Sequence, residues 1–112
     1  MHDQGIESRA YKRHPIRTRG HLLFNGRSPI LVRTLDISIG GLCVVSEITL
    51  PIKIQGSIEL SMPMGNGRFA LQQINVLVIH SIFSNKEDGF RVGLMFINLA
   101  PNLQKVIHAM DQ

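Results

Sequence analysis

The apolar residues of this 112-residue chain fall into six short runs separated by turn-forming residues, and this spacing constrains the fold more than any other feature. Some runs alternate apolar and polar residues, as in Ser-Ile-Glu-Leu-Ser-Met at 57–62, which is typical of a strand with one buried face. Short strands joined by glycine- and asparagine-containing turns are typical of all-β folds. The pattern predicts a small antiparallel barrel or sandwich, with strands at 20–24, 29–37, 41–46, 56–62, 69–82 and 90–97.

The longest run, residues 69–82, changes the parity of its apolar positions. Phe69 and Leu71 are odd-numbered, whereas the apolar residues within 74–78 that continue the pattern are even-numbered. Because side chains alternate between the two faces of a strand, this change predicts a β-bulge near residues 72–73.

The two ends of the chain differ from the strand region between them. Residues 1–18 mix charges, lack apolar periodicity and include Pro15, so we expect a flexible basic arm in front of a single domain at 19–112. After Pro101 the apolar residues are three and four apart, which predicts one short amphipathic helix that must pack on the barrel to be stable. Its apolar residues are Leu103, Val106, Ile107 and Met110.

Basic residues are concentrated near the start of the chain, and the net charge is +4. A local positive field attracts polyanions, so the candidate partners are nucleic acid, an anionic membrane surface or a small phosphorylated ligand. A solvated tail that binds nothing is the alternative. The basic residues concerned are Arg9, Lys12, Arg13, Arg17, Arg19, Arg27 and Arg33.

Several other classes of protein are disfavoured by the sequence. The five histidines have no metal-ligand spacing, and we expect the single cysteine, Cys43, to be a buried structural thiol. There is no nucleophile elbow, phosphate loop or pair of carboxylates, so we expect neither an enzyme nor a cofactor. No apolar run is long enough to span a membrane and no signal peptide is recognisable, so we expect a cytoplasmic protein.

The segment Asp36-Ile37-Ser38-Ile39-Gly40-Gly41 joins two of the predicted strands. In a strand, Asp36 and Ser38 project to the same side, so a carboxylate and a hydroxyl stand together beside two glycines. A carboxylate accepts hydrogen bonds through two oxygens, and the Watson-Crick edge of guanine presents two parallel donors. The segment predicts a shelf that binds guanine, and a simple turn is the alternative.

Two arginines on the arm, Arg13 and Arg17, are spaced four residues apart. Guanidinium groups fork onto phosphate oxygens and stack on base planes. We therefore expect both to close over a small guanine-containing diphosphate, and we expect alanine at either position to weaken binding without unfolding the chain. Arg9 and Arg13 have the same spacing, so this second pair stays open as an alternative, although Arg17 lies nearer the first strand.

Arg13-x-x-x-Arg17 and Asp36-x-Ser38-x-x-Gly41 together resemble the RxxxR and D/NxSxxG motifs of the PilZ domain family. The resemblance extends over nearly the whole chain. It implies a six-stranded antiparallel β-barrel that binds the bacterial second messenger cyclic di-GMP, often as an intercalated dimer of the ligand. It also implies a conformational signal to a protein partner in the control of motility, biofilm formation or exopolysaccharide output.

The resemblance assigns a role in ligand binding to each motif residue. Arg13 and Arg17 clamp the guanines and phosphates, Asp36 holds a guanine edge, Ser38 bonds polar atoms of the ligand, and Gly41 lets the backbone approach. Candidate residues with secondary roles are Arg9, Lys12, Gly40 and Gly93, the last in the Val-Gly-Leu-Met-Phe segment that looks like the family's closing strand. Lysine at position 12, where arginine is common in the family, leaves open the ligand stoichiometry, and the sequence does not decide whether the protein is a homodimer.

Two other functions are consistent with the same barrel. One is a protein-interaction module of PilZ shape that binds no nucleotide, which ranks second because such modules generally lack the arginine motif. The other is a small nucleic-acid-binding barrel, which is disfavoured because aromatic residues, the usual stacking platforms, make up only 5% of the chain.

Overall fold

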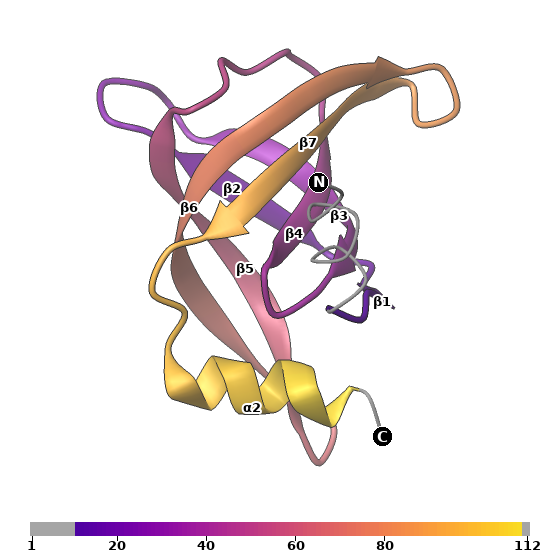
Figure 1. Cartoon of the computed structure of the whole chain (residues 1–112), viewed down its shortest axis with the longest axis vertical. Coiled ribbons are helices and arrows are strands. Elements are labelled where there is room, and N and C mark those ends of the chain that lie inside the picture. The colour runs from indigo at the N-terminus through magenta and orange to yellow at the C-terminus, as the bar shows by residue number, and fades with distance from the viewer. Residues whose placement is uncertain (1–10, 111–112) are drawn as a thin grey trace, which may run out of the picture.

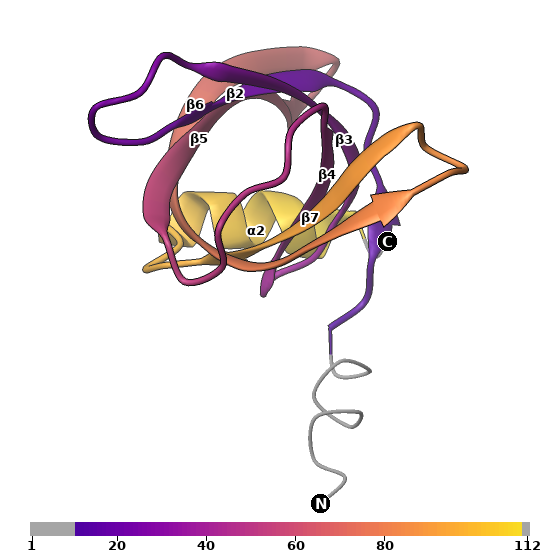
Figure 2. The same ribbon diagram turned by 90° about the horizontal axis from the view of Figure 1, so that it is seen from above.

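Six antiparallel strands close into a barrel in the computed structural model, which describes residues 11–110 (Figures 1 and 2). Neighbouring strands follow the order β3-β2-β5-β6-β7-β4, and β4 pairs back onto β3 to complete the ring. Each of the six predicted apolar runs forms one of these strands, which confirms the predicted all-β barrel. The barrel strands are β2 (Arg19–Leu23), β3 (Ile30–Ile37), β4 (Gly41–Ser46), β5 (Gln55–Gly65), β6 (Arg68–Ser84) and β7 (Gly89–Phe96).

Alternation along the strands fills the barrel with apolar side chains. In β5, Ile58, Leu60 and Met62 are at most 1% exposed, while the residues between them are less deeply placed or polar. They pack with buried residues of every other barrel strand in one continuous core. Burying a side chain of this size stabilises the fold by about 1.5–3 kcal/mol, so the chain needs no disulfide or metal to fold.

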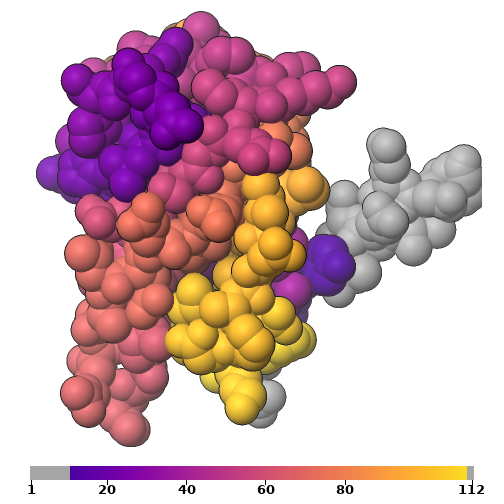
Figure 3. All heavy atoms as spheres, turned by 90° about the vertical axis from the view of Figure 1, so that its left-hand side faces the viewer, coloured from indigo at the N-terminus to yellow at the C-terminus, as the bar shows by residue number. Residues whose placement is uncertain are grey.

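The predicted C-terminal helix forms as α2 (Pro101–Ala109) and covers one end of the barrel (Figures 1 and 3). Proline suits the first helical turn, where its missing N–H leaves no hydrogen bond unmade. Leu103 and Ile107, one turn apart, are buried in the barrel core. This packing holds a helix of nine residues that would not be stable alone. Within residues 11–110, no helix has the length and apolar content needed to cross a membrane.

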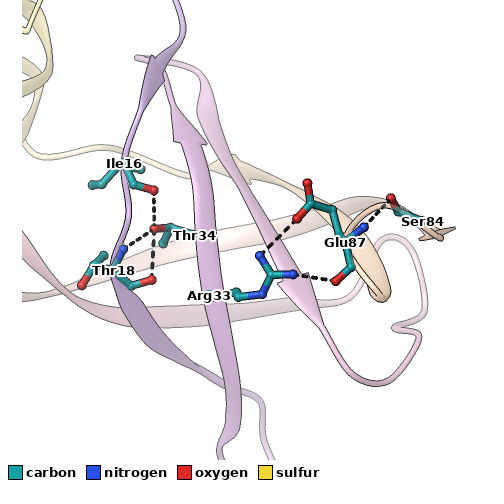
Figure 4. Close-up of polar contacts among 6 residues, drawn as sticks. All are labelled: Ile16, Thr18, Arg33, Thr34, Ser84 and Glu87. Atoms are coloured by element: carbon teal, nitrogen blue, oxygen red, sulfur yellow. Dashed lines mark hydrogen bonds and ion pairs between the residues drawn. The ribbon is translucent and has the colours of Figure 1, made fainter.

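A two-residue strand, β1 (His14–Pro15), lies at the end of the predicted arm and pairs with β3. Beyond it the chain stays against β3, because the Thr34 hydroxyl donates to the Ile16 carbonyl at 2.7 Å and accepts from the Thr18 amide at 2.9 Å (Figure 4). Residues 14–18 are therefore attached to the barrel rather than free as predicted. The rest of the predicted flexible arm lies largely outside the described residues.

Arg33, one of the basic residues near the start of the chain, has a structural partner in the β6–β7 turn, on the other side of β4. Its guanidinium donates to the Glu87 carboxylate at 3.1 Å and to the Glu87 carbonyl at 2.6 Å (Figure 4). The Glu87 amide in turn donates to the Ser84 hydroxyl at 3.3 Å. These contacts join β3 to the β6–β7 turn, so part of the basic cluster supports the fold.

The predicted bulge near residues 72–73 is wrong. Register between β5 and β6 is unbroken there, with Gln72 opposite Leu60 and Gln73 opposite Glu59. The apolar positions change parity because Phe69 and Leu71 face solvent, each with 67% of its surface exposed. The shift in β6 occurs later, between Val78 and His80, where the strand pairs with β7.

Candidate ligand-binding site

A β-bulge in β3 turns Asp36 out of the barrel. Val32 and Thr34 are buried, and without an irregularity Asp36 would point the same way. The register with β4 shifts between Thr34 and Asp36, so that Ile37 takes the inward position and is fully buried. Asp36 is thereby placed on the outer surface, which is a common use of bulges beside functional sites.

Arg13 meets Asp36 directly. Pro15 of β1 lies opposite Asp36 in the register with β3, and the Arg13 Nη1 atom donates to Asp36 Oδ1 at 2.6 Å. The two side chains keep 59% and 25% of their surface exposed. An arginine of one predicted motif and the carboxylate of the other are thus joined across 23 residues of sequence, at a place that solvent reaches.

Ser38 holds the tight turn between β3 and β4. Its hydroxyl oxygen accepts from the Gly40 amide at 3.1 Å and from the Gly41 amide at 3.3 Å, while its own amide donates to the Gly41 carbonyl at 2.8 Å. The amides of Gly40 and Gly41 are therefore used within the turn. A hydroxyl that accepts two bonds retains its own hydrogen for an acceptor, so Ser38 can still donate to a ligand.

Gly41 is required by the packing of this turn against β7. A Cβ atom at Gly41 would lie 2.1 Å from the Leu94 carbonyl oxygen, and one at Gly40 would lie 3.1 Å from the Tyr11 ring. The close approach that Gly41 permits is thus to the backbone of β7. A contact between Gly41 and a ligand stays a prediction.

A second bulge, in β6, brings two more side chains to the same surface. Val78 points into the core, and the shift between Val78 and His80 leaves both Ile79 and His80 exposed. The His80 ring lies over Gly93 of β7, where a Cβ atom would approach its Nε2 to 2.2 Å. Gly93 therefore makes room for the histidine ring.

Two adjoining open cavities lie where these features meet. The main cavity, of about 760 Å³, is bounded by the Ser38–Gly41 turn, Arg13, Ile79, Met95 and the start of α2. The side cavity, of about 200 Å³, is bounded by Arg13, Asp36, Cys43, His80, Arg91 and Gly93. Arg13 and Ile79 line both, so the two cavities are adjacent. Within residues 11–110, no cluster of three potential metal ligands is present.

Comparison with known proteins identifies the family to which this barrel belongs. The PilZ domain family model matches residues 7–110. The chain belongs to the PilZ domain family. No protein of curated function matches it in sequence.

Solved PilZ structures share the fold at low sequence identity. The PilZ domain of YcgR from Escherichia coli, solved with c-di-GMP, has a TM-score of 0.65 and 17% identity, over 90% of this chain and 89% of that one. The Bacillus subtilis inhibitor of motility MotI has a TM-score of 0.77 and 14% identity over 90% of this chain. This PilZ chain spans 48% of the length of MotI.

A third solved structure is a tetrameric PilZ protein from Xanthomonas campestris that assembles through a helical bundle. Its TM-score is 0.52 at 20% identity, over 74% of this chain and 45% of that one. At these identities, the likeness to all three proteins establishes the barrel fold.

The predicted arginines of this PilZ domain differ in position. Arg13 lines both cavities, whereas Arg17, also exposed, lines neither of them. Lys12 is exposed, and Arg9 lies outside the described residues. The choice between the two arginine pairs left open by the sequence, Arg13 with Arg17 or Arg9 with Arg13, stays a prediction.

Several residues that line the site, among them four from β6 and β7, were not singled out by the sequence. Ile79, His80, Arg91 and Met95 come from β6 and β7, some 40 to 60 residues beyond the aspartate motif. They reach it because β4 pairs with β3 on one side and with β7 on the other. That strand order, and the bulge that turns His80 outward, are tertiary features that no local spacing encodes.

Cys43 forms the floor of the side cavity and is 6% exposed. Burial raises the pKa of its thiol above the ordinary value, and a hydrogen bond with the Arg91 side chain opposes this shift. The thiol is therefore expected to stay protonated near neutral pH, which fits the predicted structural role.

We expect iodoacetamide at pH 8 to alkylate Cys43 at least about tenfold more slowly in the folded protein than in urea, because the thiolate is the reactive form. We also expect the free energy of unfolding to fall as the pH rises above about 9. The unfolded thiol has the lower pKa and loses its proton first, which favours the unfolded state. Alkylation at equal rates in both states would contradict the buried, protonated thiol.

Proposed function

We propose that this chain is a cytoplasmic receptor for cyclic di-GMP, and that it is a binding protein rather than an enzyme. The observation that carries the proposal is the 2.6 Å contact between Arg13 and Asp36 at the junction of the two cavities. It joins one arginine of the RxxxR motif to the DxSxxG motif in a PilZ barrel. Its relative YcgR was solved with c-di-GMP, which supports the same ligand class here.

The chemistry of the site suits a guanine dinucleotide. Asp36 uses Oδ1 to accept from Arg13. Its Oδ2 atom would accept one of the two guanine donors, and Oδ1 would accept the other through its second lone pair or after the ligand displaces Arg13. The Arg13 guanidinium, whether released from Asp36 or still shared with it, then binds a phosphate or stacks on the face of the base. Ser38 donates from the adjacent turn. Exposed Ile79 and Met95 provide apolar surface for the planar rings.

Signal relay would follow from the position of Arg13 directly before β1. A ligand that draws Arg13 away from Asp36 also pulls on β1, which is only two residues long. Fixing Arg13 and its neighbours on the ligand has a cost in conformational entropy that the ligand contacts must exceed. A protein partner that binds this altered surface would complete the relay, in motility, biofilm or exopolysaccharide control. The similar fold of MotI, an inhibitor of motility, favours the first of these.

A protein-interaction module is the second candidate function, and one observation favours it. Phe69 and Leu71 lie on the outer side of the β5–β6 hairpin, which projects beside α2 (Figures 1 and 3), and each keeps 67% of its surface exposed. Exposed apolar side chains on neighbouring positions of one strand face are a common feature of protein contacts. This surface is separate from the Arg13–Asp36 site, so the two functions are compatible.

Calorimetric titration of the purified chain with cyclic di-GMP tests the proposed function. We expect saturable binding to cyclic di-GMP and at least about tenfold weaker binding to cyclic di-AMP, because adenine lacks the paired donors that Asp36 accepts. GTP is the control for a ligand that is merely anionic and contains guanine. Absence of binding to cyclic di-GMP, or equal binding of both cyclic dinucleotides, would refute the proposal. The same titration gives the ligand stoichiometry.

A further inference from the structure

The side cavity is lined by a positively charged side chain, Arg91, that has no role in the ligand contacts proposed above. Arg91 lies on β7 opposite Val45 of β4, on the outer wall of the barrel. It lines the side cavity together with Arg13 and His80. Unlike Arg13, which comes from the edge of the fold, Arg91 is anchored in the middle of a paired sheet, because β7 has neighbours on both sides.

The positive charge of Arg91 is not neutralised inside this cavity. Asp36 is the one carboxylate among the described residues that line it, and its Oδ1 atom is 2.6 Å from Arg13. The contact assigned to Arg91 is with the neutral thiol of Cys43. By contrast, Arg33 is held by the carboxylate and the carbonyl of Glu87. Arg91 is thus a surface arginine whose charge is available to an anion.

Cross-strand pairing sets the distance between Arg91 and Asp36, the residue predicted to bind the edge of guanine. Asp36 pairs with Cys43, Cys43 with Gly93, and Gly93 with His80, so one row crosses four strands. Strands lie about 4.8 Å apart, which puts Asp36 and Gly93 roughly 10 Å from each other. Arg91 lies two residues before Gly93 and on the same face. The His80 ring covers Gly93, so the floor of the side cavity between Asp36 and His80 is formed by Cys43.

We propose that Arg91, flanked by His80, forms an anion subsite that binds a phosphate group of the nucleotide. This inference rests on the proposed function, because it assigns a second contact to the same ligand. In this arrangement the guanine edge lies on Asp36 at one end of the row, and the phosphate lies on Arg91, two residues before Gly93 on β7 and beside His80 at the other end. The barrel wall then contributes a phosphate contact of its own, in addition to the arginines of the N-terminal arm.

The test compares Arg91→Gln and Arg91→Lys with Arg68→Gln as the matched control. Arg68 is an exposed arginine at the opposite end of β6 from His80. We expect Arg91→Gln to weaken binding of cyclic di-GMP by roughly 10- to 100-fold and Arg91→Lys to weaken it less. Arg68→Gln should stay within about twofold of the wild type, since it lies away from the site. Thermal unfolding of each variant verifies that the fold is retained.

The outcomes separate this inference from the proposed function. If Arg91→Gln binds cyclic di-GMP like the wild type while Arg13→Ala does not, the subsite is wrong and the receptor function stands. If the wild type binds no cyclic di-GMP, NMR titration with inorganic pyrophosphate still tests the subsite. Shifts of the Arg91 side-chain Nε–H resonance that Arg68→Gln retains would support it. An unmoved Arg91 resonance would overturn it.

Discussion

Replacing Arg13 with alanine is expected to lower the affinity for cyclic di-GMP by about 100-fold, or about 2.8 kcal/mol, while the barrel stays folded. Arg13 lines both cavities and donates to Asp36 at 2.6 Å. Its removal deletes a charge-assisted contact to the ligand, and such contacts contribute about 1.5–3 kcal/mol each. It also leaves the Asp36 carboxylate without its cation, and that negative charge then repels the ligand phosphates. Calorimetry on the folded variant measures the loss.

The stability of the Arg13→Ala variant should change little. The Arg13–Asp36 pair is exposed to solvent, and exposed ion pairs contribute about 0–1 kcal/mol to folding. The control is Arg27→Ala, which removes an exposed arginine from the turn at the far end of β3. It should leave both affinity and unfolding unchanged. Binding by Arg13→Ala at wild-type strength would contradict the placement of the ligand at Asp36.

Alanine variants of Arg9 and Arg17 decide which of these two arginines acts together with Arg13. If Arg13 pairs with Arg17, as the sequence first suggests, Arg17→Ala should lose affinity comparably. If Arg13 pairs with Arg9, Arg9→Ala should lose affinity and Arg17→Ala should stay close to the wild type. The second result is the one that the position of Arg17, outside both cavities, favours.

The strands were predictable from the sequence because their chemistry is local. In β5, Ile58, Leu60 and Met62 are buried while Glu59 and Ser61 between them are partly exposed, and the order of apolar and polar residue types predicts this alternation. The helix at Pro101–Ala109 was predictable for the same reason. Apolar residues on a solvent face, such as Phe69 and Leu71, break this logic. Pattern alone cannot distinguish an exposed apolar side chain from a change of face at a bulge, and that is why the predicted bulge was wrong.

The sequence indicated the residues of the site that lie in its motifs, but not how the fold orients them. Asp36 and Ser38 border the two adjoining cavities, and Ile37 between them is turned into the core. The orientation of Asp36, however, depends on the bulge after Thr34, which adjusts the register with β4. Residues of β6 and β7 reach the site through the pairing of β4 with β7 and of β7 with β6. Strand order is decided by the packing of the whole barrel, so Ile79, His80 and Arg91 have no signature in the sequence, and Gly93 was a candidate only through the family resemblance.

Replacing Gly41 with alanine is expected to destabilise the fold by about 3 kcal/mol or more and to abolish ligand binding. The added Cβ would lie 2.1 Å from the Leu94 carbonyl oxygen, which is backbone in the middle of a paired strand. Overpacking typically costs about 1–3 kcal/mol where side chains can move, and here the neighbour is a carbonyl that cannot rotate away. The β3–β4 turn must then move off β7, which disrupts the hydrogen bonds from the Gly40 and Gly41 amides to Ser38.

Urea unfolding with Gly26→Ala as the control separates this clash from the general effect of losing a glycine. Gly26 has a φ of +77° with no atom within 4 Å of an added Cβ, so its substitution costs only the backbone strain of about 1–2 kcal/mol. Gly41 has no positive φ, so any larger loss at this position comes from the contact with Leu94. A Gly41→Ala protein that unfolds within about 1 kcal/mol of the wild type would show that the turn can move away from β7 at little cost. Binding by that variant would then show that the Ser38 turn is not needed to hold the ligand.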